Sequence, residues 1–135
     1  MSSSDIEHLN VRDLQTLPDE GPVVMLNFMR FREYSLGGNG TGWAAYLRYS
    51  ALAVKLIKGV GGTIIWAAKA EAIALGGADR HHWDYAALVR YPSCAAFLSM
   101  MEPSGYAAAN IERNNGCADH LIIATPELFG NFNAA

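Results

Sequence analysis

The segment VVMLNFMR, residues 23–30, decides the fold of this 135-residue chain. Apolar residues occupy both the odd-numbered and the even-numbered positions of this segment, except for Asn27 and the terminal Arg30. Successive side chains of a strand point to opposite faces of a sheet, so a strand of this composition is buried on both faces. The segment therefore predicts a central strand in a sheet that has both faces covered.

Outward from this strand, turn signals and apolar periodicity predict the order strand, helix, strand, strand, helix, strand. Thr41 caps the first helix, which runs to about residue 60 with an apolar stripe that includes Leu47 and Ala51, and Ser93 caps the second. Residues 63–75 mix strand-forming and helix-forming types, and we interpret them as a strand because a glycine-rich turn leads into the next strand-like run. The later elements are strands over 82–91 and 118–125 and helices over 94–101 and 103–113.

This order is the split βαβ arrangement of the ferredoxin-like fold. Helices cover one sheet face in that fold, so the second apolar face of residues 23–30 is expected to meet another copy of the chain. We therefore expect an α+β, ferredoxin-like βαββαβ sandwich that forms a homodimer through its open sheet face. The expected organisation is an N-terminal helical extension over 1–20, begun by a capping box at 4–7, a domain over 21–126 and a C-terminal tail over 127–135.

Composition and charge narrow the classes of function. A chain of this length with 51% hydrophobic residues is one domain with its own core, which excludes a two-domain enzyme. The net charge of −3 leaves no electrostatic footprint for nucleic acid or an anionic membrane. Since no signal sequence or bilayer-spanning apolar run is present, we expect a cytoplasmic protein. Cys94 and Cys117 lack disulfide or zinc-ligand spacing, so we expect buried thiols, no metal site and no cofactor.

Two local patterns suggest cofactor sites, and neither fits its context. Residues 40–45 read GTGWAA and match G-x-G-x-x-A before a helix, but the first glycine lies well beyond the strand and no Rossmann sheet fits in this chain. The loop over 36–42 is better interpreted as a lid. His81 and His82 are adjacent, so they point to opposite faces of a strand and do not form a two-ligand metal site.

Polar residues converge at one end of the predicted sheet. In the split βαβ topology, the end of the first strand lies beside the starts of the third and fourth strands and the start of the first helix. We place a pocket for a small polar or anionic compound here, between the helices and the sheet edge. The expected ligand-binding residues are Asn27, Arg30, Tyr46, Tyr49, Trp83, Arg113 and Asp119, and His120 lies at the same end.

His82 and Asp84 are the candidate catalytic residues. They are two apart in the predicted strand, so both project from one face with Cα atoms about 6.5–7 Å apart, where a carboxylate can orient an imidazole. The functional interpretation is a base that removes a proton beside a carbonyl or from a phenol, with Asn27 and either Tyr46 or Tyr49 donating to the developing oxyanion. In the structural interpretation, Asp84 bonds arginines or backbone amides and His82 is a surface residue. Asn27 and Arg30 have opposite parity, so both face the helices only if a bulge intervenes.

Several short motifs, in this order, resemble a known family. They are NFMRFR at 27–32, GG at 61–62, WD at 83–84, RYPS at 90–93, PSGY at 103–106 and Arg113. Together they resemble the domain family of unknown function 1330, in the dimeric α+β barrel superfamily, over about residues 21–124. The superfamily includes muconolactone isomerases, cofactor-free monooxygenases and haem-dependent relatives. The resemblance implies the fold and the dimer, and leaves open whether the chain performs cofactor-independent isomerase or monooxygenase chemistry or is a non-catalytic binding or dimerisation module.

Overall fold

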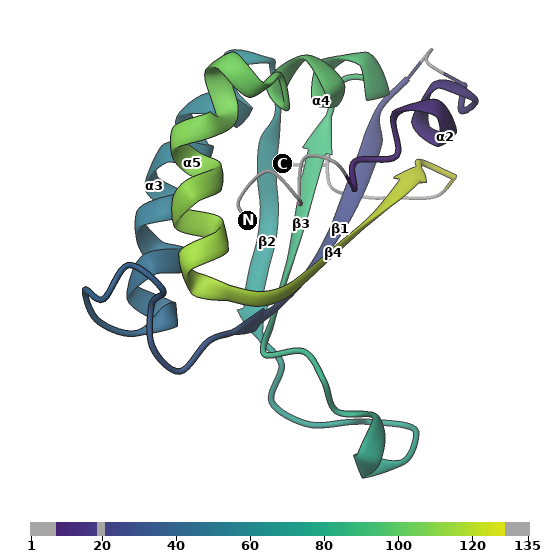
Figure 1. The fold of residues 1–135 in the computed structure, drawn as a ribbon. Helices are drawn as coiled ribbons and strands as arrows, with labels where there is room; N and C mark the ends of the chain where they lie inside the picture. Colours follow the sequence, from purple (N-terminus) through teal and green to yellow (C-terminus); the bar gives the residue numbers. More distant parts are fainter. Residues whose placement is uncertain (1–7, 19–20, 129–135) are drawn as a thin grey trace.

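A computed structural model describes residues 8–18 and 21–128 (Figure 1). Its four-stranded sheet has the order β2-β3-β1-β4. The strands are β1 (Val23–Phe31), β2 (Thr63–Lys69), β3 (Tyr85–Tyr91) and β4 (Cys117–Pro126). The helical segments are α2 (Val11–Gln15), α3 (Gly42–Gly59), the 3-10 helix η1 (Ala78–Arg80), α4 (Cys94–Met100) and α5 (Pro103–Gly116). The capping box predicted at residues 4–7 lies outside the described residues.

The strand order confirms the predicted α+β fold of ferredoxin-like topology. β1 lies inside the sheet, antiparallel to β3 on one side and to β4 on the other, and β2 pairs antiparallel with β3 at one edge. Figure 1 shows α3 and α5 side by side across one face, with α4 at the end of the sheet. The opposite face carries no helix in the described part of the chain (Figure 1).

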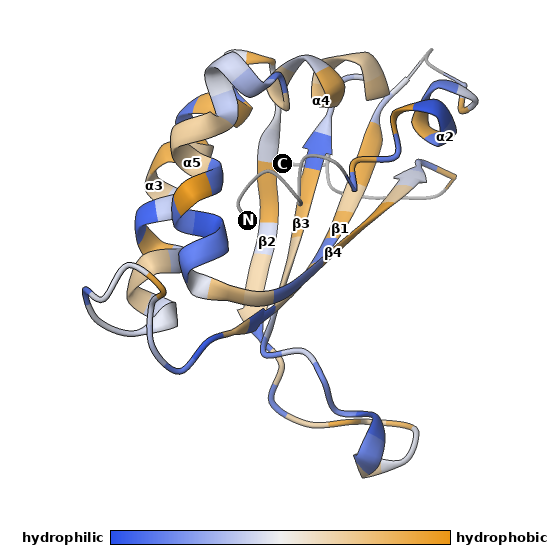
Figure 2. Ribbon diagram, in the orientation of Figure 1, coloured by the Kyte–Doolittle hydropathy of each residue, from blue (hydrophilic) through white to orange (hydrophobic). Residues whose placement is uncertain are grey.

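β1 contributes apolar side chains to both faces of the sheet. Val23, Met25 and Met29 are turned toward the helices and are almost fully buried in the core. Leu26 and Phe28 alternate with them and are only partly buried on the open face. Figure 2 shows hydrophobic residues along β1, β2 and β3. The helices therefore cover one apolar face and leave the other accessible.

The two predicted helix caps are confirmed. Thr41 Oγ1 accepts a hydrogen bond from the Ala44 N–H at 3.1 Å, at the start of α3. Ser93 Oγ accepts one from the Ala96 N–H at 3.1 Å, at the start of α4. These hydroxyls satisfy N–H groups that the first helical turn leaves without backbone partners, so both helices begin where the sequence predicts.

The buried side of α3 differs from the predicted stripe. Leu47 is 49% exposed and Ala51 is also exposed, whereas Tyr46 is buried. The reason is the close contact between α3 and α5. A Cβ atom at Gly116 would lie 2.5 Å from the carbonyl oxygen of Gly42, so only glycine fits at this crossing. This crossing turns the start of α3 inward and Leu47 toward solvent.

The hairpin strands β2 and β3 are shorter than predicted. β2 ends at Lys69 and β3 begins at Tyr85, whereas the sequence predicts strand to residue 75 and from residue 82. Residues 70–82 are exposed and project beyond the sheet as an arm (Figure 1). A two-stranded ribbon with no covering layer is marginal in water, so the ladder stops where the sheet loses its third strand.

The cysteines and helices carry few special features. Cys94 and Cys117 are both buried, which confirms the predicted burial of the two side chains. Of the helices within residues 8–18 and 21–128, none has both the length and the apolar character that crossing a bilayer requires. The same two stretches hold no group of three or more His, Cys, Asp or Glu side chains able to bind a metal ion.

Candidate functional site

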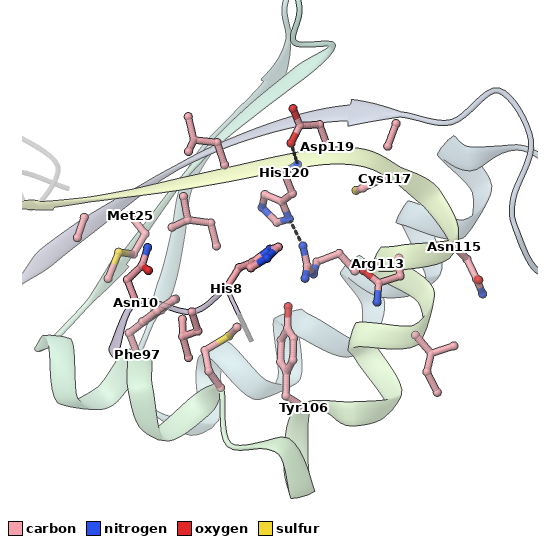
Figure 3. A pocket seen from close by; sticks show the side chains of 18 of the residues that line it. His8, Asn10, Met25, Phe97, Tyr106, Arg113, Asn115, Cys117, Asp119 and His120 are labelled. Atoms are coloured by element: carbon pink, nitrogen blue, oxygen red, sulfur yellow. Dashed lines mark hydrogen bonds between the residues drawn. The ribbon is translucent and has the colours of Figure 1, made fainter. Parts of the chain in front are cut away.

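A cavity of about 720 Å³ lies between α5, β4 and the segment that leads into α2 (Figure 3). Its volume falls in the range of pockets that hold small organic ligands. Apolar side chains line the end next to α4, with Asn10 among them, and polar side chains gather at the other end. The apolar part is formed by Leu9, Leu14, Met25, Phe97, Met101, Ile122 and Ala124, and the polar part includes His8, Tyr106, Arg113 and His120.

Arg113 supplies a buried positive charge at the cavity wall. It is 8% exposed and lies in the last turn of α5. Its Nε and Nη2 donate to Oδ1 of Asn110 at 3.2 and 3.0 Å, and its Nη1 donates to Nδ1 of His120 on β4 at 3.0 Å. Figure 3 shows the guanidinium pointing into the cavity. Partners on two elements therefore fix the direction in which this charge faces.

His120 is a neutral histidine that holds Arg113 in place. Because a guanidinium only donates, Nδ1 of His120 is the acceptor and Nε2 carries the proton. That Nε2–H donates to Oδ1 of Asn27 at 3.0 Å, and the Asn27 amide donates in turn to the carbonyl oxygen of Met25 at 3.1 Å. Burial, with the Arg113 charge as a second cause, lowers the pKa of His120 to about 3. His120 is consequently not a base near neutral pH.

Two tyrosines, the buried Tyr106 and the partly buried Tyr49, extend this network toward α3. Tyr106 Oη donates to Tyr49 Oη at 3.1 Å. Burial raises the pKa of Tyr106 and raises that of Tyr49 well above its ordinary value, although the charge of Arg113 acts in the opposite direction on both. Both phenols are therefore neutral hydrogen-bonding groups. Of these two tyrosines, Tyr106 lines the cavity. Tyr49, a predicted ligand-binding residue, does not line it and contacts Tyr106 instead.

Tyr46, another predicted ligand-binding residue, lies in a separate aromatic cluster of the core. Its ring centroid is 5.0 Å from that of Phe31, 5.7 Å from that of Trp43 and 5.6 Å from that of Tyr85. Burial raises the pKa of Tyr46. The structure thus places this side chain between α3 and the sheet, away from the cavity wall.

The remaining polar residues gather on the open face, at the same end of the sheet. His82 Nε2 lies 2.8 Å from Asp119 Oδ2. Arg30 Nη1 donates to the carbonyl oxygen of His82 at 3.2 Å and lies 3.4 Å from its Nδ1. The Trp83 and His82 rings pack edge to face, with their centroids 4.6 Å apart. Figure 3 shows the Asp119 carboxylate on the opposite side of β4 from His120, although Asp119 is itself one of the residues that line the cavity.

The expected pairing of His82 with Asp84 needs correction. Asp84 Oδ2 accepts a hydrogen bond from the Phe31 N–H at 2.8 Å, and the Asp84 N–H donates to the carbonyl oxygen of Met29 at 2.8 Å. β3 begins after these residues, at Tyr85, so the alternation of a strand does not align His82 with Asp84. Asp84 thus follows the structural interpretation, and the carboxylate beside His82 is that of Asp119.

Asn27 and Arg30 lie on opposite faces, as their parity predicts. The bulge in the pairing of β1 with β4 falls after both, between Arg30 and Phe31. Asn27 faces the helices and accepts a hydrogen bond from His120. Arg30 faces the open side and donates a hydrogen bond to the carbonyl oxygen of His82. Asn27 therefore finds its hydrogen bonds within the protein.

Tyr106, Asn110 and His120 belong to the cavity network and were not selected from the sequence as ligand-binding residues, whereas Arg113 was. Tyr106, Asn110 and Arg113 lie on α5 at spacings of four and three, which places them on one helix face. His120 shares its parity with Ile122, a core-facing residue of β4. Helical spacing and strand parity are therefore the signals that could have identified them.

Two solved structures are similar to this chain over most of its length. One is a crystal structure of a protein of unknown function from Rhodopseudomonas palustris, a structural genomics target, with 29% identity, a TM-score of 0.79, and coverage of 89% of this chain and 92% of that chain. The other is a methylated form of that protein, with 30% identity, a TM-score of 0.77, and coverage of 90% of this chain and 92% of that chain. No protein-family model and no curated protein matches the chain.

Proposed function

This chain belongs to the same family as the Rhodopseudomonas palustris protein of unknown function, and we propose that it binds a small polar or anionic compound in the cavity between α5 and β4. The observation that carries the proposal is the buried guanidinium of Arg113 at the cavity wall. Burial of a charge is costly unless it is hydrogen-bonded, and here Asn110 and His120 hold it facing a cavity of ligand size.

The test is a thermal-shift screen of chemically diverse compounds: small carboxylates, phenols, acyl thioesters, amines and haem. A ligand at about one hundred times its dissociation constant stabilises the folded state by about 2.7 kcal/mol, which raises Tm visibly. The shift should disappear in Ala124→Phe, which fills the cavity, and remain in Ala107→Phe, at an exposed position of α5. The proposal fails if no compound raises Tm, or if both variants keep the shift.

A catalytic role has one specific observation in its favour. His82 and Asp119 form a histidine–carboxylate pair at 2.8 Å, with Arg30 beside Nδ1. Such a pair suits cofactor-independent acid–base chemistry of the isomerase or monooxygenase type. Inside the cavity, His120 has both ring nitrogens engaged and a pKa of about 3. Ligand binding without chemistry is therefore the function that the cavity supports best, and the pair on the open face is the second candidate.

The two candidates separate in one experiment. Once a ligand is found, its turnover by the wild type is compared with that by His82→Ala and Asp119→Asn. An enzyme that uses the pair loses turnover in both variants while the ligand still raises Tm. A ligand that is recovered unchanged from the wild type excludes catalysis on that compound.

We also propose a homodimer that forms through the open sheet face. Trp66, Leu121 and Ile123 are 50%, 42% and 43% exposed on this face, and Leu26 and Phe28 lie between them, partly buried. An apolar sheet face of this kind is typical of an interface, and a two-fold axis lets one face cover its copy. A dimer of this kind would also support the resemblance to the domain family of unknown function 1330.

Sedimentation or light scattering tests the dimer. The wild type should be a dimer at micromolar concentration, and Trp66→Glu should make it a monomer, because a carboxylate would be buried in the apolar interface. Leu47→Glu is the matched control, since Leu47 is equally exposed on the outer side of α3. A monomeric wild type, or dissociation by the control as readily as by Trp66→Glu, would overturn the proposal.

A further inference from the structure

The wall of the cavity is divided into two chemically different parts. At the end next to α4, the lining includes Met25 from β1 and Phe97 and Met101 from α4 and its C-terminal end, with Asn10 beside them (Figure 3). At the other end, Arg113 and Tyr106 project inward from α5 (Figure 3). A ligand that fills the whole cavity must therefore be apolar along its body and polar at one end.

At the polar end, two of the hydrogen-bonding partners of the Arg113 guanidinium are neutral side chains. Asn110 has no charge, and His120 accepts from Arg113 through an unprotonated Nδ1. Tyr106 and Tyr49 share one hydrogen bond and keep their protons, because burial raises the pKa of both. These contacts hold the positive charge of Arg113 at the cavity wall, which Arg32 and Asp119 also line.

The guanidinium is also rigid. Its Nε and Nη2 share the same acceptor, Asn110 Oδ1, and its Nη1 is tied to His120, which is itself tied to Asn27 on β1. A planar guanidinium fixed in this way matches the planar, two-oxygen geometry of a carboxylate. Little conformational entropy remains to be lost when such an acceptor arrives.

From these observations, and resting on the proposed function of the cavity, we infer that the ligand is a monocarboxylate with an apolar body. Its carboxylate meets Arg113, within reach of the Tyr106 hydroxyl, and its alkyl or aryl body lies against Met25, Phe97 and Met101. The cavity of about 720 Å³ has room for an aryl or medium-chain acid. Neutral or cationic compounds of the same shape lack the interaction with the guanidinium.

Isothermal titration calorimetry with matched probes tests the inference on the unmodified protein. Octanoate should bind at least about tenfold more tightly than octan-1-ol or octylamine, because only octanoate presents a negatively charged, two-oxygen acceptor to Arg113. Along the series butanoate, hexanoate and octanoate, each added CH₂ should tighten binding about fourfold, since each buries further apolar surface. Equal binding of the three octyl compounds, or no gain with chain length, overturns the inference.

Variants locate the carboxylate. Arg113→Gln should abolish the preference for octanoate over octan-1-ol, whereas Arg48→Gln should keep it, because Arg48 pairs with Glu112 and does not line the cavity. Should Arg113→Gln fail to fold, Phe97→Leu tests the apolar end, where the gain per CH₂ should shrink. An unchanged preference in Arg113→Gln, or an unchanged gain in Phe97→Leu, overturns the inference.

The outcomes also separate this inference from the proposed function. If octanoate does not bind but another compound of the diverse screen binds and loses its effect in Ala124→Phe, the cavity is a ligand site and the monocarboxylate assignment is wrong. If neither the octyl series nor the diverse screen gives a ligand, both proposals are overturned.

Discussion

Replacing His120 with glutamine is expected to change how protein stability depends on pH. Burial lowers the pKa of this histidine from 6.5 to about 3 in the folded chain. Below about pH 6.5 the unfolded chain takes up a proton that the folded chain does not accept until about pH 3. The free energy of unfolding is therefore highest above the unfolded pKa of about 6.5, and it falls as pH drops from there toward the folded pKa of about 3. Between about pH 7 and about pH 4.5, this one group lowers the free energy of unfolding by about 2–3 kcal/mol.

Urea unfolding of both proteins across this pH range measures the effect. Protein concentration is held constant, because the stability of a dimer depends on it. Near neutral pH, His120→Gln should be less stable by about 1–3 kcal/mol, since the hydrogen bonds to Arg113 and Asn27 are disturbed. Glutamine does not titrate, so this difference should shrink, or reverse in sign, as pH falls.

The control for this experiment is His81→Gln, which removes a histidine from an exposed position of the arm. The comparison is made on the difference in free energy of unfolding between each variant and the wild type. A difference for His120→Gln that stays constant from pH 7 to pH 4.5 would show that His120 titrates alike in the folded and unfolded chains, and would refute the reasoning.

Three further substitutions test the packing and the hydrogen bonds. Gly116→Ala should lower the free energy of unfolding by about 1–3 kcal/mol, because its Cβ would lie 2.5 Å from a backbone oxygen of α3. Gly59→Ala is the control, because open space surrounds Gly59 and no such loss is expected. Equal denaturation midpoints for the two variants would contradict this prediction. Asp84→Ala should cost about 1 kcal/mol in chemical denaturation through loss of the bond to the Phe31 amide, and a larger effect on turnover than on stability would instead make Asp84 catalytic. Tyr106→Phe should cost about 1 kcal/mol of thermal stability by removing a buried donor, and an unchanged Tm would show that the hydroxyl contributes nothing to stability.

The fold was predictable because its main signals are local. Apolar residues at both odd-numbered and even-numbered positions of 23–30 predict a strand with two apolar faces, and β1 has two such faces. Thr41 and Ser93 cap the helices that follow them, because a hydroxyl at this position satisfies an amide only three residues away. The extent of the hairpin strands was less predictable, since it depends on where the neighbouring strands stop.

Part of the candidate site was predictable for the same reason. Arg113 was expected at the cavity end of the second long helix, and it lines the cavity there. Parity alone predicts that Asn27 and Arg30 lie on opposite faces, and they do. Tyr46 could not be assigned in this way, because a tyrosine near the start of α3 can face either the cavity or the aromatic core, and the crossing with α5 decides which.

By itself, therefore, the sequence determined the order of the elements, their caps and the faces of the central strand, all of which depend on residues within a few positions of one another. Only the tertiary structure decided that His82 meets Asp119 while Asp84 meets a backbone amide. It also decided that His120 is partly buried beside Arg113. Such pairings join residues far apart in the chain, and they are fixed by strand register and helix packing, which no local pattern encodes.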